Sequence, residues 1–172
     1  MSQNRLKSIK DKGKESLYPA KTKILVGLAS CGKAAGAQGV YSVFLDWFRD
    51  DDSVEVGKTG CLGFCSKEPL VEIVHPDKGS VIYQNVDLQS AKELAQSLKD
   101  GEIPIENALA TRDYRSDREN SIDNVKDLDS LPFYKEQKKI VLRNSGEIDP
   151  ESLEEYVATG GYFGLNEVLT EY

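Results

Sequence analysis

Three cysteines are the residues of this chain best suited to metal or redox chemistry. Cys61 and Cys65 form a C-x3-C unit beside two glycines, Gly60 and Gly63, and Cys31 lies 30 residues upstream of Cys61. Thiolates are soft ligands that select zinc, copper or iron–sulfur clusters, and glycine lets backbone N–H groups approach a charged cluster. The spacing differs from that of zinc ribbons, which use C-x2-C pairs. The pattern therefore indicates a metal or redox centre built from two segments.

The elements around Cys31 are expected to be a strand and a helix. Residues 23–29 form a short apolar run typical of a buried strand, and Ser30 to Gly32 follow as a loop. A helix N-terminus after this loop would stabilise thiolate charge. That helix is expected over residues 34–48, where large apolar side chains recur at helical spacing: Val40, Val43, Phe44, Trp47 and Phe48.

Further strands are expected on both sides of the other two cysteines. They cover residues 53–58, 70–74 and 81–83, and the turn Asp77-Lys78-Gly79 joins the last two. Asp87 is a suitable N-cap for a second helix. This order predicts an α/β fold, with a mixed sheet of about four strands and helices packed on it. Two loops at the same end of that sheet could bring the three thiolates together.

The chain is expected to divide into four parts. Residues 1–20 form a basic arm, in which Leu6 suggests a weakly amphipathic helix surrounded by solvent. Residues 21–104 hold the α/β domain. Residues 105–131 are rich in charge and in Asn and Ser, which is typical of an exposed linker.

The fourth part, residues 132–172, combines few large apolar side chains with signals for three elements. Ile140 to Leu142 is expected to be a strand, Asp149 to open a helix that ends at Gly160, and a last helix to begin near Tyr162. About forty residues with so little apolar area rarely fold alone. This C-terminal extension therefore packs on the first domain, docks on a partner, or opens a larger domain.

Charge and composition restrict the classes of protein. The net charge is −7, and the first 23 residues carry seven Lys or Arg and two Asp or Glu, which leaves −12 on the other 149 residues. An acidic body argues against nucleic acid as a partner. No apolar run reaches the roughly 18 residues of a membrane span, and no signal peptide is expected. An odd number of cysteines without such a signal favours a reducing, cytoplasmic location over a disulfide framework.

Two stretches of the chain resemble a known family. Residues 26–37, VGLASCGKAAGA, and residues 58–72, KTGCLGFCSKEPLVE, resemble a thioredoxin-like [2Fe–2S] ferredoxin domain. That domain begins the NADH-oxidising flavin subunit of bacterial NADH dehydrogenase (complex I), NAD-linked hydrogenase and formate dehydrogenase. Residues 131–162 resemble the segment that leads into the flavin domain of the same subunit. The resemblance implies a thioredoxin-like fold, followed over residues 132–172 by the incomplete beginning of a flavin-binding domain.

The resemblance also implies a function in electron transfer. Cys31, Cys61 and Cys65 would bind a [2Fe–2S] cluster in an electron-transfer module of an NADH-dependent redox complex. The family's glycine-rich loop for NADH and flavin would lie beyond Tyr172, so neither FMN nor NADH is expected on this chain alone, nor is NADH oxidation. The expected partners are other subunits of an NADH-dependent oxidoreductase or hydrogenase complex, or a second copy of the chain.

The family pattern and this sequence differ at one ligand position. The usual first ligand lies five residues before Cys31, where this chain has Val26. If the family's geometry holds, the side chain of Val26 lies near Cys31 and close to a vacant ligand position. Thioredoxin-like folds also often carry a cis peptide bond before the strand beside their redox loop, which is expected here between Glu68 and Pro69.

Four interpretations of the cysteines therefore remain open. The first is a [2Fe–2S] cluster with three thiolate ligands and an unidentified fourth ligand. The second is a thioredoxin-like assembly or binding module that has lost its cluster. The third is a zinc site of three cysteines that His75 completes. The fourth is a thiol–disulfide switch between Cys61 and Cys65.

Overall fold

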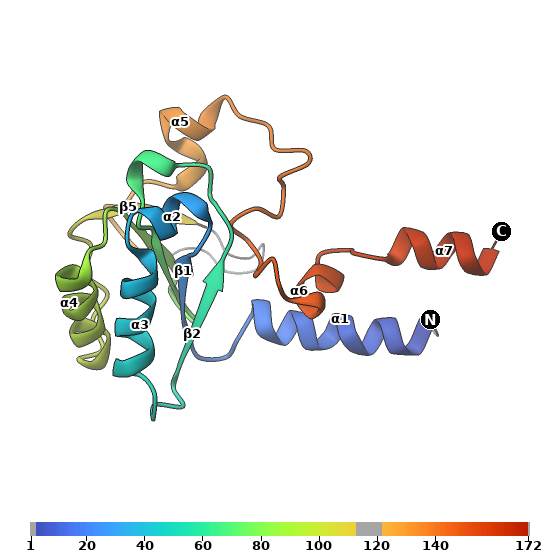
Figure 1. The fold of residues 1–172 in the computed structure, drawn as a ribbon, viewed down its shortest axis with the longest axis horizontal. Coiled ribbons are helices and arrows are strands. Elements are labelled where there is room, and N and C mark those ends of the chain that lie inside the picture. Colours follow the sequence, from blue (N-terminus) through green and yellow to red (C-terminus); the bar gives the residue numbers. More distant parts are fainter. Residues whose placement is uncertain (1–2, 113–121, 172) are drawn as a thin grey trace.

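A mixed sheet of five strands forms the centre of the computed structural model, which describes residues 3–112 and 122–171. The strand order is β2-β1-β3-β4-β5, with β1 (Thr22–Gly27) parallel to β2 (Val54–Thr59). The other neighbours are antiparallel: β1 with β3 (Val71–His75), β3 with β4 (Gly79–Tyr83), and β4 with β5 (Ala108–Arg112). Helices connect β1 to β2 and follow the β3–β4 hairpin (Figure 1). This is the connectivity of a thioredoxin-like fold, and it confirms the predicted α/β class.

One face of the sheet is covered by helices α3 (Ala37–Trp47) and α4 (Leu88–Lys99). The carboxylate of Asp87 accepts a hydrogen bond from the N–H of Ser90 at 2.8 Å, so the predicted N-cap of α4 is confirmed. Alternate residues of the strands meet these helices in the main core. Its buried members are Ile24, Val26, Ala37, Val40, Phe44, Phe48, Val71, Ile73, Val81, Tyr83, Val86, Ala91, Leu94 and Ala95.

The helix expected over residues 34–48 is α3, which begins three residues later, at Ala37. A short helix, α2 (Ser30–Ala34), precedes α3, and the two are separated at Gly36, whose φ of +99° lies outside the helical region. Glycine adopts this backbone conformation without the steric cost that a Cβ would impose. Cys31 therefore lies in the first turn of α2, whereas a loop was expected at this position.

The fifth strand lies where the sequence predicts a linker. β5 pairs with β4 through residues 108–112, and Ala110 and Thr111 are buried. Its sequence, ALATR, lacks the run of large apolar residues that identifies a strand, so its formation depends on pairing with β4. The sheet therefore has five strands, one more than the approximate number expected. Residues 113–121 of the expected linker lie outside the described residues.

The other face of the sheet is covered by the C-terminal part of the chain. Residues 128–148, here called the covering segment, include η2 (Leu128–Ser130) and α5 (Pro132–Lys135). The guanidinium of Arg112 on β5 pairs with Glu72 on β3 and, at 2.6 Å, with Glu147 of the covering segment. The segment also completes a second core, whose buried residues are Leu62, Leu70, Ile82, Ala110, Leu128 and Tyr134.

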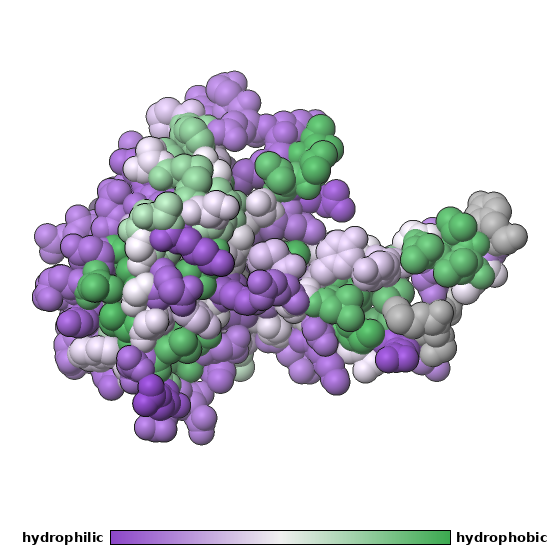
Figure 2. Space-filling view, viewed as in Figure 1, coloured by the Kyte–Doolittle hydropathy of each residue, from purple (hydrophilic) through white to green (hydrophobic). Residues whose placement is uncertain are grey.

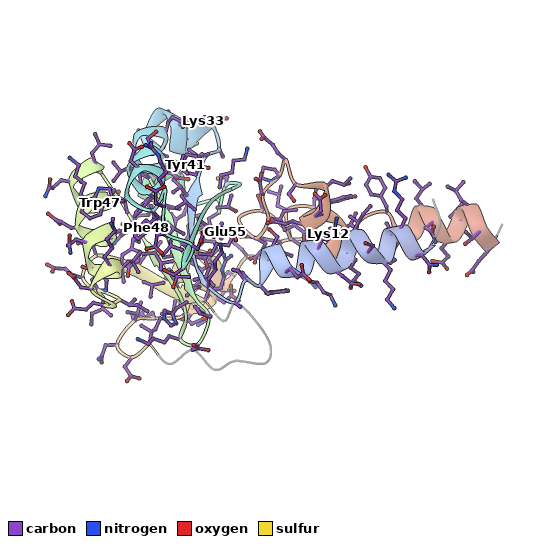
Figure 3. All side chains as sticks on the ribbon, turned by 90° about the horizontal axis from the view of Figure 1, so that it is seen from below. Lys12, Lys33, Tyr41, Trp47, Phe48 and Glu55 are labelled. Carbon is purple, nitrogen blue, oxygen red and sulfur yellow. The ribbon has the colours of Figure 1, made fainter. Side chains whose placement is uncertain are left out.

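Three helices form an arm that extends away from the sheet (Figures 1 and 3): α1 (Gln3–Leu17), α6 (Leu153–Ala158) and α7 (Phe163–Glu171). Leu6 and Leu17 of α1 are buried, and a Cβ at Gly13 would lie 2.0 Å from the carbonyl oxygen of Glu154. That approach is too close for any side chain at position 13. The N-terminal segment is therefore a packed helix, and the expectation that it is surrounded by solvent is wrong.

A buried ammonium group joins this arm to the sheet. Nζ of Lys23 on β1 donates to the carbonyl of Ser16 at 2.6 Å and lies 3.5 Å from Glu155 on α6. The same glutamate accepts from the hydroxyl of Ser16 at 2.7 Å and from the N–H of Asp149 at 2.6 Å. The C-terminal extension thus packs on the first domain, which is one of its three expected fates.

Two expectations for the extension are wrong. Residues 140–142 form no strand; Ile140, Val141 and Leu142 are 68%, 91% and 64% exposed on a protruding loop, where Figure 2 shows apolar surface. The helix expected to open at Asp149 begins at Leu153, because Ser152 is its N-cap and accepts from the N–H of Glu155 at 3.2 Å. No helix in residues 3–112 and 122–171 combines the length and apolar character needed to cross a membrane.

Candidate metal centre

The structure brings the three cysteines to one edge of the sheet. Cys31 follows β1 on α2, whereas Cys61 and Cys65 follow β2 in the segment of residues 61–65, here called the cysteine loop. Because β1 and β2 are parallel neighbours, both connections leave the sheet at the same end (Figure 1). Cys31 and Cys65 are exposed, Cys61 is half-buried, and all three are free thiols.

Cys65 is a neighbour of both other cysteines, and a backbone N–H is directed at Cys61. The thiol of Cys65 lies within hydrogen-bonding reach of both the Cys31 and the Cys61 thiols. Sγ of Cys61 accepts a hydrogen bond from the N–H of Gly63 at 3.2 Å, and Gly63 has a φ of +91°. A backbone N–H directed at a cysteine sulfur is one of the features that tune iron–sulfur centres.

The thiols of the cysteine loop hold their protons more tightly than free cysteine does. Burial raises the pKa of Cys61, and the hydrogen bond with Cys31 is the largest cause of the raised pKa of Cys65. A thiol–disulfide switch needs a thiolate as its nucleophile, so these shifts argue against the switch. A metal ion would displace the protons, because thiols bind metals as thiolates.

His75 lies at the opposite end of the sheet from the cysteines. β3 begins at Val71, which pairs with Val26 near the cysteine edge, and it ends at His75 beyond the pairing of Lys23 with Val74. At about 3.3 Å per residue, His75 is roughly 13 Å from the cysteine end of its own strand. The interpretation of the cysteines as a zinc site that His75 completes is therefore wrong.

The cysteines suit a two-iron cluster better than a single ion. No three His, Cys, Asp or Glu side chains of the described residues converge on one metal ion. A [2Fe–2S] cluster distributes four ligands over two iron atoms, so its ligands need not converge on one point. Three thiols from two loops, with a backbone N–H already directed at one sulfur, fit this arrangement.

Val26 is a core residue in this structure. It is fully buried, and its side chain belongs to the main core on the face of the sheet that α3 and α4 cover, as does that of Ile24. Its neighbours in the strand, Leu25 and Gly27, belong to the opposite face. A valine at position 26 is thus accounted for by packing alone.

A buried carboxylate, Glu68, lies beside the cysteines and was not identified as a site residue from the sequence. Its Oε2 accepts a hydrogen bond from the N–H of Leu70 at 2.8 Å, whereas Oε1 is buried and has no hydrogen-bond partner among the described residues. Burial raises the pKa of Glu68. The available signal was a charged residue directly before Pro69, and the cis peptide bond expected there is confirmed.

The covering segment holds the cysteine loop in place. The carbonyl of Leu62 accepts hydrogen bonds from the hydroxyl of Tyr134 at 3.2 Å and from Nζ of Lys139 at 3.4 Å. The carbonyl of Cys61 accepts from the hydroxyl of Ser145 at 2.9 Å.

Aromatic stacking adds to these hydrogen bonds. The ring of Phe64, inside the cysteine loop, stacks on Phe133 at a centroid distance of 4.2 Å. The covering segment therefore supports the cysteine loop directly.

Comparisons with known proteins add partial sequence similarities. No protein-family model matches the chain. Over 76 residues it is 37% identical to the NADP-reducing hydrogenase subunit HndB of Solidesulfovibrio fructosivorans, a match that covers 43% of this chain and 60% of that subunit. Over 36 residues it is 56% identical to subunit HndC of the same organism, which covers 21% of this chain and 7% of HndC.

Solved structures give a weaker likeness. A thioredoxin-like [2Fe–2S] ferredoxin from Aquifex aeolicus is 20% identical, with a TM-score of 0.46, and the match covers 53% of this chain and 92% of the ferredoxin. The chain thus spans less than two thirds of each of the two hydrogenase subunits that it matches.

Proposed function

We propose that this chain is an electron-transfer module of a multisubunit redox complex, with a [2Fe–2S] cluster bound by Cys31, Cys61 and Cys65. The observation that carries the proposal is the placement of three free thiols on two loops at one sheet edge, with the Cys65 thiol next to those of Cys31 and Cys61. When bound, such a cluster accepts and donates one electron at a time. The N–H of Gly63 would stabilise negative charge on Sγ of Cys61, and the covering segment would hold the loop rigid.

The similarity to the hydrogenase subunits HndB and HndC supports a place in such a complex. We infer further that the complex draws its electrons from NADH or a related nicotinamide, that its other subunits are the partners, and that it works in the cytoplasm. Residues 132–172 would then form the beginning of a flavin-binding domain. Neither FMN nor NADH is assigned to this chain alone.

A second candidate is a cluster-free module that helps to assemble the same kind of complex. It is favoured by Val26, an apolar core residue at the position of the family's usual first ligand. It is also favoured by the hydrogen bonds from Tyr134 and Ser145, which hold the cysteine loop through contacts within the protein.

Iron binding distinguishes the two candidates. The full chain, purified without oxygen and reconstituted with iron and sulfide, is expected to hold about two iron and two sulfide per chain, to absorb visible light, and to give an EPR signal after reduction. Cys31→Ser and Cys61→Ser are expected to lose most of this iron, whereas the neighbouring Ser66→Ala should retain it. Wild-type protein without iron would support the assembly module.

A further inference from the structure

We propose that Glu68 supplies the fourth ligand of the cluster, through a carboxylate oxygen. This inference rests on the proposed function and adds a residue that the cysteine pattern does not contain. It is carried by the position of the carboxylate beside the cysteines, by its missing partner, and by the ligand count of the site.

Glu68 lies within reach of both cysteine-bearing segments. It follows Cys65 by three residues, and its Oε2 would lie 3.2 Å from a Cβ placed on Gly32, the residue next to Cys31. With standard backbone dimensions, this puts the Cα of Cys31 at most about 8.5 Å from the carboxylate. The negative charge of Glu68 is also one of the causes of the raised pKa of Cys61.

The carboxylate packs against two glycines of the segment that carries Cys31. A Cβ on Gly27 would lie 3.4 Å and 3.5 Å from the two carboxylate oxygens. Both Gly27 and Gly32 belong to the strand and helix that position Cys31. Glu68 is only 8% exposed, and its Oε1 is buried.

The carboxylate lacks the partners that other buried carboxylates of this molecule have. Glu72, four residues later, accepts from the hydroxyl of Ser80 at 2.7 Å and pairs with Arg112. Among the described residues, Glu68 forms no ion pair with any Lys, Arg or His, and Oε1 accepts no hydrogen bond. Burial of a charged group without compensation is costly unless it is paired or coordinates a metal. An iron ion beside Oε1 would provide that compensation.

The ligand count gives the carboxylate a position to occupy. Each iron of a [2Fe–2S] cluster takes two protein ligands. With three thiolates, one iron would have both of its ligands and the other would have one, so one place would stay open. Val26 has no atom that could bind there. A carboxylate carries the same charge as the thiolate it replaces, and its oxygen is a good ligand for ferric iron. The cluster would therefore be asymmetric, with two thiolates on one iron and one thiolate with one carboxylate on the other.

Mössbauer spectra of reconstituted ⁵⁷Fe protein test this assignment. The wild type is expected to show two distinct ferric quadrupole doublets of equal area, one for each iron environment. In Glu68→Cys, which supplies a fourth thiolate, the two doublets should become nearly identical. Glu68→Gln, which keeps the shape and the acceptor for Leu70 but loses the charge, should hold at least two-fold less iron after gel filtration.

Val26→Cys is the matched control, because it introduces a thiol at the alternative ligand position. It is expected to leave both wild-type doublets unchanged. Merging of the doublets in Val26→Cys, or wild-type iron content and spectra in both Glu68 variants, would overturn the assignment of Glu68. Circular dichroism of the metal-free variants checks their folding, and if Glu68→Gln does not fold, the spectrum of Glu68→Cys decides.

Different outcomes would contradict the proposed function and the assignment of Glu68. Wild-type protein that holds no iron under any condition contradicts the proposed function and removes Glu68 as a ligand with it. A wild-type cluster that is insensitive to both changes at Glu68 contradicts only the assignment of Glu68 and leaves the electron-transfer module intact.

Discussion

The two faces of the sheet are buried by different kinds of contact. Against α3 and α4, the strands present apolar residues such as Ile73 and Val81, and the main core is formed by apolar side chains together with Tyr83. Against the covering segment and the arm, the same strands present Lys23, Glu72 and Ser80, each almost completely buried. Glu155 pairs with Lys23 across the interface, and Arg112 on β5 pairs both with Glu72 in the sheet and with Glu147 of the covering segment.

This difference shows that the two faces are stabilised by different interactions. The apolar face is stabilised by burial of hydrocarbon, which is non-directional. The polar face depends on specific partners, because a buried charge that loses its partner is strongly destabilising. The cysteine loop belongs to the polar face, since Leu62 and Tyr134 pack together in the second core. The candidate metal centre therefore depends on contacts that single substitutions can break.

The largest effect is expected from Arg112→Met on the polar face. The change leaves the buried carboxylate of Glu72 and that of Glu147 without their cation, so the free energy of unfolding should fall by about 3–5 kcal/mol. Chemical denaturation of the full chain measures it. Arg49→Met, which removes an exposed arginine paired with Asp46, is the control and should change stability by less than about 0.5 kcal/mol. Equal losses in both variants would contradict the contrast between paired and exposed charges.

A somewhat smaller loss of free energy of unfolding is expected from a substitution on the apolar face. Ile73→Ala deletes a 1% exposed side chain of the main core and should cost about 3 kcal/mol, within the range for buried isoleucine. Ile140→Ala is the matched control, because Ile140 is 68% exposed and its truncation should be nearly neutral. The same denaturation experiment measures both. A large loss at Ile140 would show that the protruding loop is packed in solution.

A single hydrogen bond to the cysteine loop gives a third, smaller effect. Tyr134→Phe removes the donor to the carbonyl of Leu62 and should lower the free energy of unfolding by about 1 kcal/mol. Amide hydrogen exchange should accelerate in the cysteine loop more than in α4. Tyr156→Phe, which alters a 43% exposed ring on α6, serves as the control. Uniform acceleration in all elements would show that the hydrogen bond has no local role.

The smallest effect concerns the protonation of the cysteine loop. Because the pKa values of Cys61 and Cys65 are raised, thiolates form at a higher pH in the folded protein than in the unfolded chain. Alkylation of the metal-free protein by iodoacetamide should therefore increase with pH, with a midpoint above that of the same protein in urea. Mass spectrometry of the peptide carrying both cysteines follows the reaction. A folded-state midpoint at or below the urea value would contradict the raised pKa values.

The apolar face was largely predictable from the sequence, because the regular spacing of apolar residues indicates which side of a helix or strand is buried. Val40 and Phe44 repeat at helical spacing, and Asp87 marks the start of α4. The break at Gly36 was not predicted, since the apolar residues that indicate the helix all lie after it and do not mark its first turn. β5 was missed because small and polar residues occupy a strand that pairing with β4 stabilises.

The polar face could not be predicted in this way. Lys23 and Glu72 stand next to apolar residues in their strands, as solvent-facing residues do. No neighbouring residue in the sequence indicates that Glu155 or Arg112 will pair with them. For the same reason the exposed tripeptide at Ile140 had the composition of a strand but found no partner strand among the described residues. The spacing of the cysteines predicted their shared edge, whereas the carboxylate of Glu68 had no signal beyond its neighbour Pro69.

The contact between α1 and α6 has a consequence for the order of folding. The hydroxyl of Ser16 donates a hydrogen bond to Glu155, 139 positions later in the chain. The lack of a side chain at Gly13 lets the carbonyl of Glu154 approach closely. Closing so long a loop carries a high entropic cost and slows the formation of the contacts that depend on it. During synthesis, α1 must therefore wait until residues 153–158 of α6 have left the ribosome before it can bury Leu6 and Leu17.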